Sequence, residues 1–269
     1  MKKGFIISAV LLIVLFQGWG IQVHAKGKQK KKVLCLTATA GFRHADSINA
    51  SIEVLKKLAE ESGKFEVIFT EDCAQINPEN LKQYDAVIFN NTSGELPISD
   101  EGKKALIDFV KSGKGFMGIH AATDTCYGWP EYGELIGGRF DGHPWSQRVR
   151  ILVEDKKHPS TKHLGDSFEI VDEIYQHRDW SREKVRVLLR LDPTSVDLNK
   201  PDVHRKDKDF GISWCRMYGN GRSFYTALGH GGRIWKDERY QKHILGAILW
   251  ILGLEKGDAK PRPLPKEEG

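Results

Sequence analysis

The stretch that decides the fold reads Lys114-Gly115-Phe116-Met117-Gly118-Ile119-His120-Ala121-Ala122-Thr123-Asp124. Its apolar half predicts a short buried strand over 115–119, and this strand ends directly in a histidine followed by small residues. In an open α/β sheet, the residue at the carboxyl end of a strand faces the ligand crevice. Many α/β hydrolases place a Ser or Cys nucleophile on a strained turn at this point. Here the position holds His120, a poor nucleophile but a good proton carrier or metal ligand.

Strands and helices alternate along the first half of the chain. Asn77 followed by Pro78 predicts a helix start, as does Ser99, because these residue types satisfy the free amides of a first helical turn. Strands that alternate with helices favour a mainly parallel sheet covered on both faces. The predicted strands are 33–37, 65–69, 85–89 and 115–119, and the predicted helices are 47–62, 78–82 and 99–113.

The second half of the chain changes pattern. Alternating polar and apolar residues over 146–153 predict a longer, half-exposed strand. A Gly219-Asn220-Gly221 turn predicts a hairpin, and apolar spacing over 240–252 predicts a last helix. Further strands are predicted over 168–175, 185–191, 210–217 and 222–228.

The ends of the chain predict export. Two lysines, an apolar run of about a dozen residues over 5–16 and a small residue at Ala25 are typical of a cleaved signal peptide over 1–25. The apolar run is shorter than the roughly 20 residues of a membrane span, so we expect no stable span after cleavage. A basic leader over 26–31, one domain over 32–254 and a disordered tail over 255–269 follow, in a periplasmic or extracellular protein.

Charge argues against one class of partner, and the cysteine spacing argues against a zinc finger. The chain carries 41 Lys and Arg against 36 Asp and Glu, with no basic face in its body, so we expect no nucleic-acid partner. Its four cysteines are scattered without metal-finger spacing, so one disulfide is an option whose pairing the sequence does not assign. The oligomeric state is also left open.

Four histidines and a carboxylate fall where predicted strands end. Each has a plain structural interpretation, as a helix cap, a turn residue or a solvated strand residue. Together, beside glycines and at the same edge of a sheet, they predict one shared site. Such a set suits a divalent transition metal such as zinc, and without metal it still supports proton transfer; the spacing leaves both open. The residues are His44, His120, His143, Glu173 and His230.

Aromatic residues lie close to these clusters in the sequence. Aromatic faces beside carboxylates and imidazoles fit a sugar ring, although core packing is the alternative for each of them. They are Tyr127, Trp129, Trp145, Tyr175, Trp180 and Trp235.

Several motifs resemble the ThuA-like, or trehalose-utilisation, family over about 32–253. They are Thr39-Ala40-Gly41-Phe42-Arg43-His44, Gly118 to Asp124, Gly137-Gly138-Arg139-Phe140 with His143, Asp172-Glu173-Ile174-Tyr175, and Gly219 to His230.

This resemblance implies a flavodoxin-like, class I glutamine amidotransferase-like three-layer α/β sandwich. That superfamily uses a Cys, a His and a Glu, whereas His120, His230 and Gly232 occupy the corresponding places here. Two of three catalytic residues are therefore missing, which argues against amidotransferase chemistry. The family implies carbohydrate catabolism alongside oxidoreductases that make 3-keto sugars. The loop after the first strand lacks a GxGxxG motif, and we expect neither nicotinamide nor flavin.

The leading hypothesis is an exported enzyme that acts on a glycoside or 3-keto-glycoside by hydrolysis, elimination or isomerisation. A non-catalytic sugar-binding protein on the same fold is the alternative, and a structural partner in an envelope complex is a third. In the leading hypothesis His120, His230 and Glu173 are catalytic, and His44, His120, His143 and His230 are candidate metal ligands. The expected substrate-binding residues are Arg43, His44, Asp124, Trp129, His143 and Tyr175.

Overall fold

One mixed sheet of nine strands forms the centre of the protein, in the order β2-β1-β3-β4-β11-β10-β9-β6-β7. The computed structural model describes Met1 and residues 29–265. Strands β2, β1, β3, β4 and β11 run parallel, and the next four pair antiparallel. The large-sheet strands are β1 (Lys31–Leu36), β2 (Phe65–Thr70), β3 (Ala86–Asn90), β4 (Gly115–Ile119), β6 (Trp145–Val153), β7 (Ser167–Ile174), β9 (Arg186–Leu191), β10 (Gly211–Tyr218) and β11 (Gly221–Thr226).

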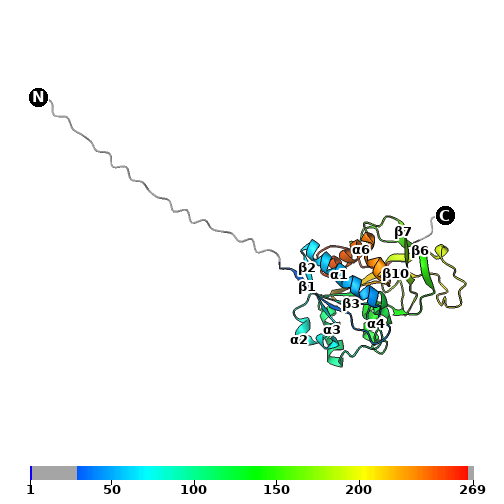
Figure 1. Ribbon diagram of the computed structural model, residues 1–269, viewed down its shortest axis with the longest axis horizontal. Helices are drawn as coiled ribbons and strands as arrows, with labels where there is room; N and C mark the ends of the chain where they lie inside the picture. The colour runs from blue at the N-terminus through cyan, green and yellow to red at the C-terminus, as the bar shows by residue number, and fades with distance from the viewer. Residues whose placement is uncertain (2–28, 266–269) are drawn as a thin grey trace.

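Helices cover both faces of this sheet, as Figure 1 shows. The first group, which packs together and against β2, β4 and β11, is α1 (Ala45–Ser62), α5 (Gly232–Trp235) and α6 (Glu238–Ile251). The second group, on the other face, is α2 (Pro78–Leu81), α3 (Asp100–Lys111) and α4 (Pro130–Ile136). The predicted three-layer α/β sandwich is therefore confirmed.

The predicted helix starts are confirmed by their caps. The Asn77 side chain accepts a hydrogen bond from the Asn80 amide, and the Ser99 hydroxyl accepts one from Gly102. Strands β3 and β4 are buried along their whole length, which explains why their sequences are continuously apolar. Strand β6 lies further out and mixes buried with exposed positions.

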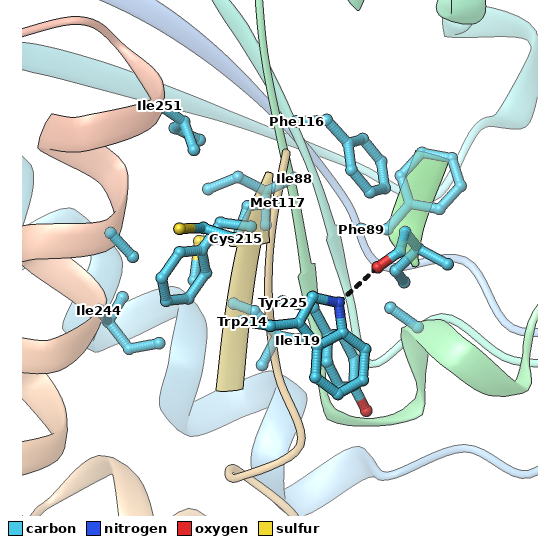
Figure 2. Close-up of a cluster of buried hydrophobic side chains, with 14 of the residues drawn as sticks. Ile88, Phe89, Phe116, Met117, Ile119, Trp214, Cys215, Tyr225, Ile244 and Ile251 are labelled. Carbon is cyan, nitrogen blue, oxygen red and sulfur yellow. Dashed lines mark hydrogen bonds between the residues drawn. The ribbon is translucent and has the colours of Figure 1, made fainter. Parts of the chain in front are cut away.

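The core is built where β4, β10, β11 and α6 meet. Figure 2 shows Phe116 and Met117 of β4 with Ile244 and Ile251 of α6, all essentially excluded from water. Full burial of one such side chain stabilises the fold by about 1.5–3 kcal/mol. The buried indole of Trp214 donates to the Ile136 carbonyl at 2.8 Å, the dashed line in Figure 2, so α4 is fastened to the sheet.

Some short elements have no counterpart in the predicted pattern. Helix α4 begins at Pro130, directly after Trp129, and strands β5 (Arg139–Phe140) and β8 (His177–Arg178) pair as a separate small sheet. Three 3-10 turns are η1 (Cys73–Gln75), η2 (His120–Asp124) and η3 (Pro193–Ser195). Elements of two to seven residues carry too little periodicity for a sequence pattern to define them.

The described part of the predicted disordered tail runs along the domain. The Trp250 indole donates to the Gly257 carbonyl at 3.0 Å, and the Arg186 guanidinium donates to that of Lys260 at 3.0 Å. Apart from Met1, the predicted signal peptide lies outside the described residues, and so does half of the basic leader, residues 26–28. Within the described ranges, no helix is long and apolar enough to cross a membrane, and all four cysteines are free and buried.

Candidate active site

Four of the predicted residues come together at the carboxyl edge of the parallel strands. His120 directly follows β4, His230 follows the neighbouring β11, and His44 is the residue before α1. Glu173 lies near the end of β7, the far edge strand, on a part of the β6–β7 pair that runs beyond the Ile151–Val153 segment joined to β9. One ligand atom from each residue lies within 4.8 Å of the other three. We call this set the His/Glu cluster.

His120 is held in a strained and fully buried position. Its backbone φ is +48°, a left-handed conformation that is uncommon for a side-chain-bearing residue. Its Nδ1 lies 2.6 Å from the Ala227 carbonyl, and only a protonated nitrogen can bond there. The Tyr225 hydroxyl donates to the His120 carbonyl at 2.8 Å. With Nδ1 used in this way, Nε2 is the ring nitrogen of His120 that faces the rest of the cluster.

His230 and Glu173 form the charged pair of the cluster. His230 Nδ1 lies 3.1 Å from Glu173 Oε2 and 3.3 Å from His120 Nε2. Burial alone would raise the pKa of the Glu173 carboxyl, but the hydrogen bonds from His120 and His230 hold that pKa well below its usual range. The same bond to Glu173 raises the pKa of His230. Without a metal, the cluster therefore favours a carboxylate beside a protonated His230.

His44 completes the cluster as a neutral imidazole. Its ring lies edge-on to those of His120 and His230, with centroids 4.9 and 5.0 Å away. Burial lowers the pKa of His44 to about 4, and the neighbouring imidazoles contribute to this lowering. Its Nδ1 is buried and has no hydrogen-bond partner among the described residues. A buried polar atom left unpaired in this way is costly, and a bound ligand would relieve the cost.

Hydrogen bonds with three polar side chains fix the loop that carries His230. Gly229, at φ +115°, donates its amide to Asp172 Oδ2 at 2.8 Å and accepts from the Ser47 hydroxyl at 2.5 Å. Gly232 donates to Asp46 Oδ2 at 2.6 Å. Asp46 and Ser47 belong to the first turn of α1, directly after His44. The first turn of α1, which follows His44, therefore also holds the loop that carries His230.

His143 and Tyr175 lie at the border of the cluster. His143 is outside the group of four, about half exposed, with Nδ1 3.6 Å from Glu173 Oε1. The ring of Tyr175 is 3% exposed and lies 4.3 Å from that of His120. Tyr175 therefore packs under His120, and His143 faces solvent beside Glu173.

Three predicted substrate-binding residues make other contacts. The Arg43 guanidinium donates to Glu71 at 2.6 Å and to the Thr37 carbonyl at 3.3 Å. Asp124 accepts from the Tyr127 hydroxyl at 2.6 Å. Trp129 is 5% exposed and stacks on Tyr132, so its indole packs in the interior.

Sequence reasoning missed the residues that support the cluster. Ser47 and Asp46 look like ordinary first-turn helix residues, and Asp172 looks like a solvated strand carboxylate. Tyr225 sits within a mostly buried strand, and nothing in its sequence surroundings points to the cluster. The one available hint was that Asp46 and Ser47 lie two and three residues after the candidate histidine His44.

The donor set fits a divalent transition metal. Three imidazole nitrogens and one carboxylate oxygen match the ligands and the number that zinc prefers. The Ala227 carbonyl fixes the His120 tautomer, as is usual for metal-binding histidines. His44, His120, His230 and Glu173 could hold such an ion, with His143 beside it.

Comparison with known proteins places the chain in a family. The family model described as ThuA, trehalose utilisation, matches residues 32–251. The chain belongs to the ThuA family. A solved ThuA-like protein from Bacteroides uniformis ATCC 8492 is 28% identical, with a TM-score of 0.69 over 85% of this chain and 93% of that one.

More distant structures share the fold. A ThuA-like protein from Parabacteroides merdae ATCC 43184 is 19% identical, with a TM-score of 0.65 over 89% of this ThuA-family chain and 96% of that one. The β-galactosidase from Bacillus circulans sp. alkalophilus is 13% identical, with a TM-score of 0.54 over 86% of this chain and 32% of that one. A comparison with curated proteins finds no match.

The site differs from an amidotransferase triad in its chemistry. His120 sits on the strained turn where that superfamily has its nucleophile, and Gly232, where a Glu is expected, donates to Asp46. The nearby Cys126 is 1% exposed, and burial raises the pKa of its thiol. A buried thiol of raised pKa is a poor nucleophile.

Proposed function

We propose that this protein is an exported enzyme that acts on a glycoside or 3-keto-glycoside through the His/Glu cluster. The observation that carries the proposal is the meeting of three imidazoles and one carboxylate from four distant segments, with ligand atoms within 4.8 Å. The trehalose-utilisation description of the family supports a carbohydrate substrate. The signal-like sequence over 1–25 supports a periplasmic or extracellular location.

A divalent metal such as zinc fits the donor set of His44, His120, His230 and Glu173. When bound, it would supply a Lewis acid for a carbonyl or hydroxyl oxygen of the sugar. The unpaired Nδ1 of buried His44 supports this assignment, because an imidazole nitrogen left without a partner is expensive to bury.

The protein's own groups suit proton transfer. A 3-keto group acidifies the proton on the neighbouring carbon. A side-chain base can therefore remove this proton at neutral pH. His143 is exposed, and its Nδ1 lies 3.6 Å from Glu173 Oε1, so the carboxylate attracts a proton on Nδ1 and leaves Nε2 to accept the substrate proton. The C–H electron pair then enters an enolate, from which hydrolysis, elimination or isomerisation can proceed.

The test is turnover by the mature chain loaded with zinc. Trehalose and 3-keto-trehalose are incubated with wild type, His120→Ala, His143→Asn and His204→Asn, and the products are followed by proton NMR. His204 is the matched control for His143, because both side chains are 54% exposed. We expect turnover of the keto sugar to fall by about 100-fold or more in His120→Ala and His143→Asn, and to persist in His204→Asn.

Unchanged sugars with wild type would end the enzymatic proposal. Saturable sugar binding without turnover would then favour the non-catalytic alternative. Full activity in His120→Ala, with its fold intact by circular dichroism, would equally contradict a catalytic role for the His/Glu cluster.

A further inference from the structure

Phe42 is exposed at the border of the His/Glu cluster. It is 69% exposed, the largest value among the described aromatic side chains. Its ring lies edge-on to that of His44, with centroids 4.8 Å apart. His44 in turn contacts His120 and His230. A ligand that covers Phe42 would therefore lie directly against the cluster.

The backbone holds Phe42 in this exposed position. Its carbonyl accepts a hydrogen bond from the Ser93 hydroxyl at 2.6 Å. The amides of Ala40 and Gly41 both donate to the Ser93 carbonyl, at 2.8 and 3.2 Å. A single exposed apolar side chain needs no explanation by itself. Here the loop is fastened at and just before Phe42, so the aromatic face is presented to solvent rather than folded onto the core.

The other aromatic candidates have no free face. The indoles of Trp129, Trp145, Trp180 and Trp235 are at most 7% exposed, and the ring of Tyr175 is 3% exposed. Tyr127 is 37% exposed, but its ring packs against the guanidinium groups of Arg139 and Arg178, 5.6 and 5.1 Å from its centroid. Among these described aromatics, Phe42 is the ring left open beside the cluster.

We infer that Phe42 is the specificity-determining platform for a hexopyranose ring. A glucose-configured pyranose carries axial C–H bonds on each face, and such an apolar face packs well on an aromatic ring. The sugar hydroxyls at the ring edge would point toward His44, His143 and His230. This inference rests on the proposed function and narrows its substrate to sugars with an unbroken apolar face.

Calorimetric titration of the protein, with and without added zinc, with trehalose and with methyl α-D-glucopyranoside tests the platform. The variants are Phe42→Ala, Phe42→Trp and Met217→Ala. Met217 is the matched control, an exposed apolar residue at the hairpin end of β10, 47% exposed. We expect Phe42→Ala to raise Kd about three- to tenfold, Phe42→Trp to restore it, and Met217→Ala to leave it unchanged.

Equal Kd values for wild type and Phe42→Ala would overturn the inference, as would the absence of glucoside binding to wild type. Zinc titration of the same variants separates the two proposals. A wild type that binds sugar through Phe42 but binds no zinc would contradict the metal site alone, whereas zinc binding without a Phe42 effect would contradict the platform alone.

Discussion

Two buried histidines outside the His/Glu cluster make the fold sensitive to acid. His158 and His243 are 0% and 1% exposed and pack near Phe224. Burial lowers the pKa of His158 to about 4 and that of His243 to about 3, from an unfolded value of 6.5. Their Nε2 atoms have no hydrogen-bond partner within the described residues. Both rings must therefore stay neutral in the folded state.

The lowered pKa values of these two histidines make the folded state less stable in acid. At pH 8 both histidines are neutral in the folded and unfolded chains, so they contribute no pH dependence. As the pH falls below 6.5, the unfolded chain binds protons that the folded chain cannot, and the folded state loses stability. Between pH 8 and pH 5 each histidine lowers the free energy of unfolding by about 2 kcal/mol.

Guanidinium unfolding of wild type and His243→Asn at pH 8, 7, 6 and 5, with chelator present, measures this effect. The asparagine keeps a donor near the Ser160 carbonyl, which His243 Nδ1 contacts at 2.9 Å. We expect the variant to lose about 2 kcal/mol less than wild type between pH 8 and pH 5. His204→Asn, at an exposed site, serves as the control. Identical pH dependence in wild type and His243→Asn would refute the reasoning.

Two further substitutions test the framework of the site. Asp172→Asn weakens the acceptor for the Gly229 amide and so loosens the loop that carries His230. We expect the zinc affinity, measured by calorimetry, to fall about 10- to 100-fold. An unchanged affinity would show that Asp172 does not position His230. Gly94→Ala places a methyl 2.6 Å from the Gly41 nitrogen at φ +72°, so the free energy of unfolding should fall by at least about 1–2 kcal/mol; an unchanged melting temperature would contradict this.

Local sequence signals predicted the parallel half of the fold well. Asn77 and Ser99 each accept a hydrogen bond from a backbone amide three residues later. Because this interaction is local, the residue type alone predicts where the helix begins. The meeting of His120 and His230 could also be predicted, because the carboxyl ends of parallel strands share one edge of a sheet. In the structure β4 lies beside β11.

Long-range geometry explains what the sequence left out. Glu173 lies on β7, five strands away from β4 in the sheet, and no local sequence pattern encodes its approach to His120. The exposure of an aromatic ring also depends on what packs over it: Trp129 is buried on Tyr132, and Phe42 is open. Residue type alone therefore does not tell which aromatic side chain is open to solvent.

The central claim is that Glu173 and three histidines form one metal-binding site. Zinc titration of the metal-free protein tests it most directly, with Glu173→Gln compared against Glu169→Gln on the same strand, where the carboxylate is 55% exposed beside Arg148. We predict one zinc per chain in wild type and Glu169→Gln, and an affinity at least about 100-fold weaker in Glu173→Gln. Equal zinc binding by the two variants, or none by wild type, would contradict the claim.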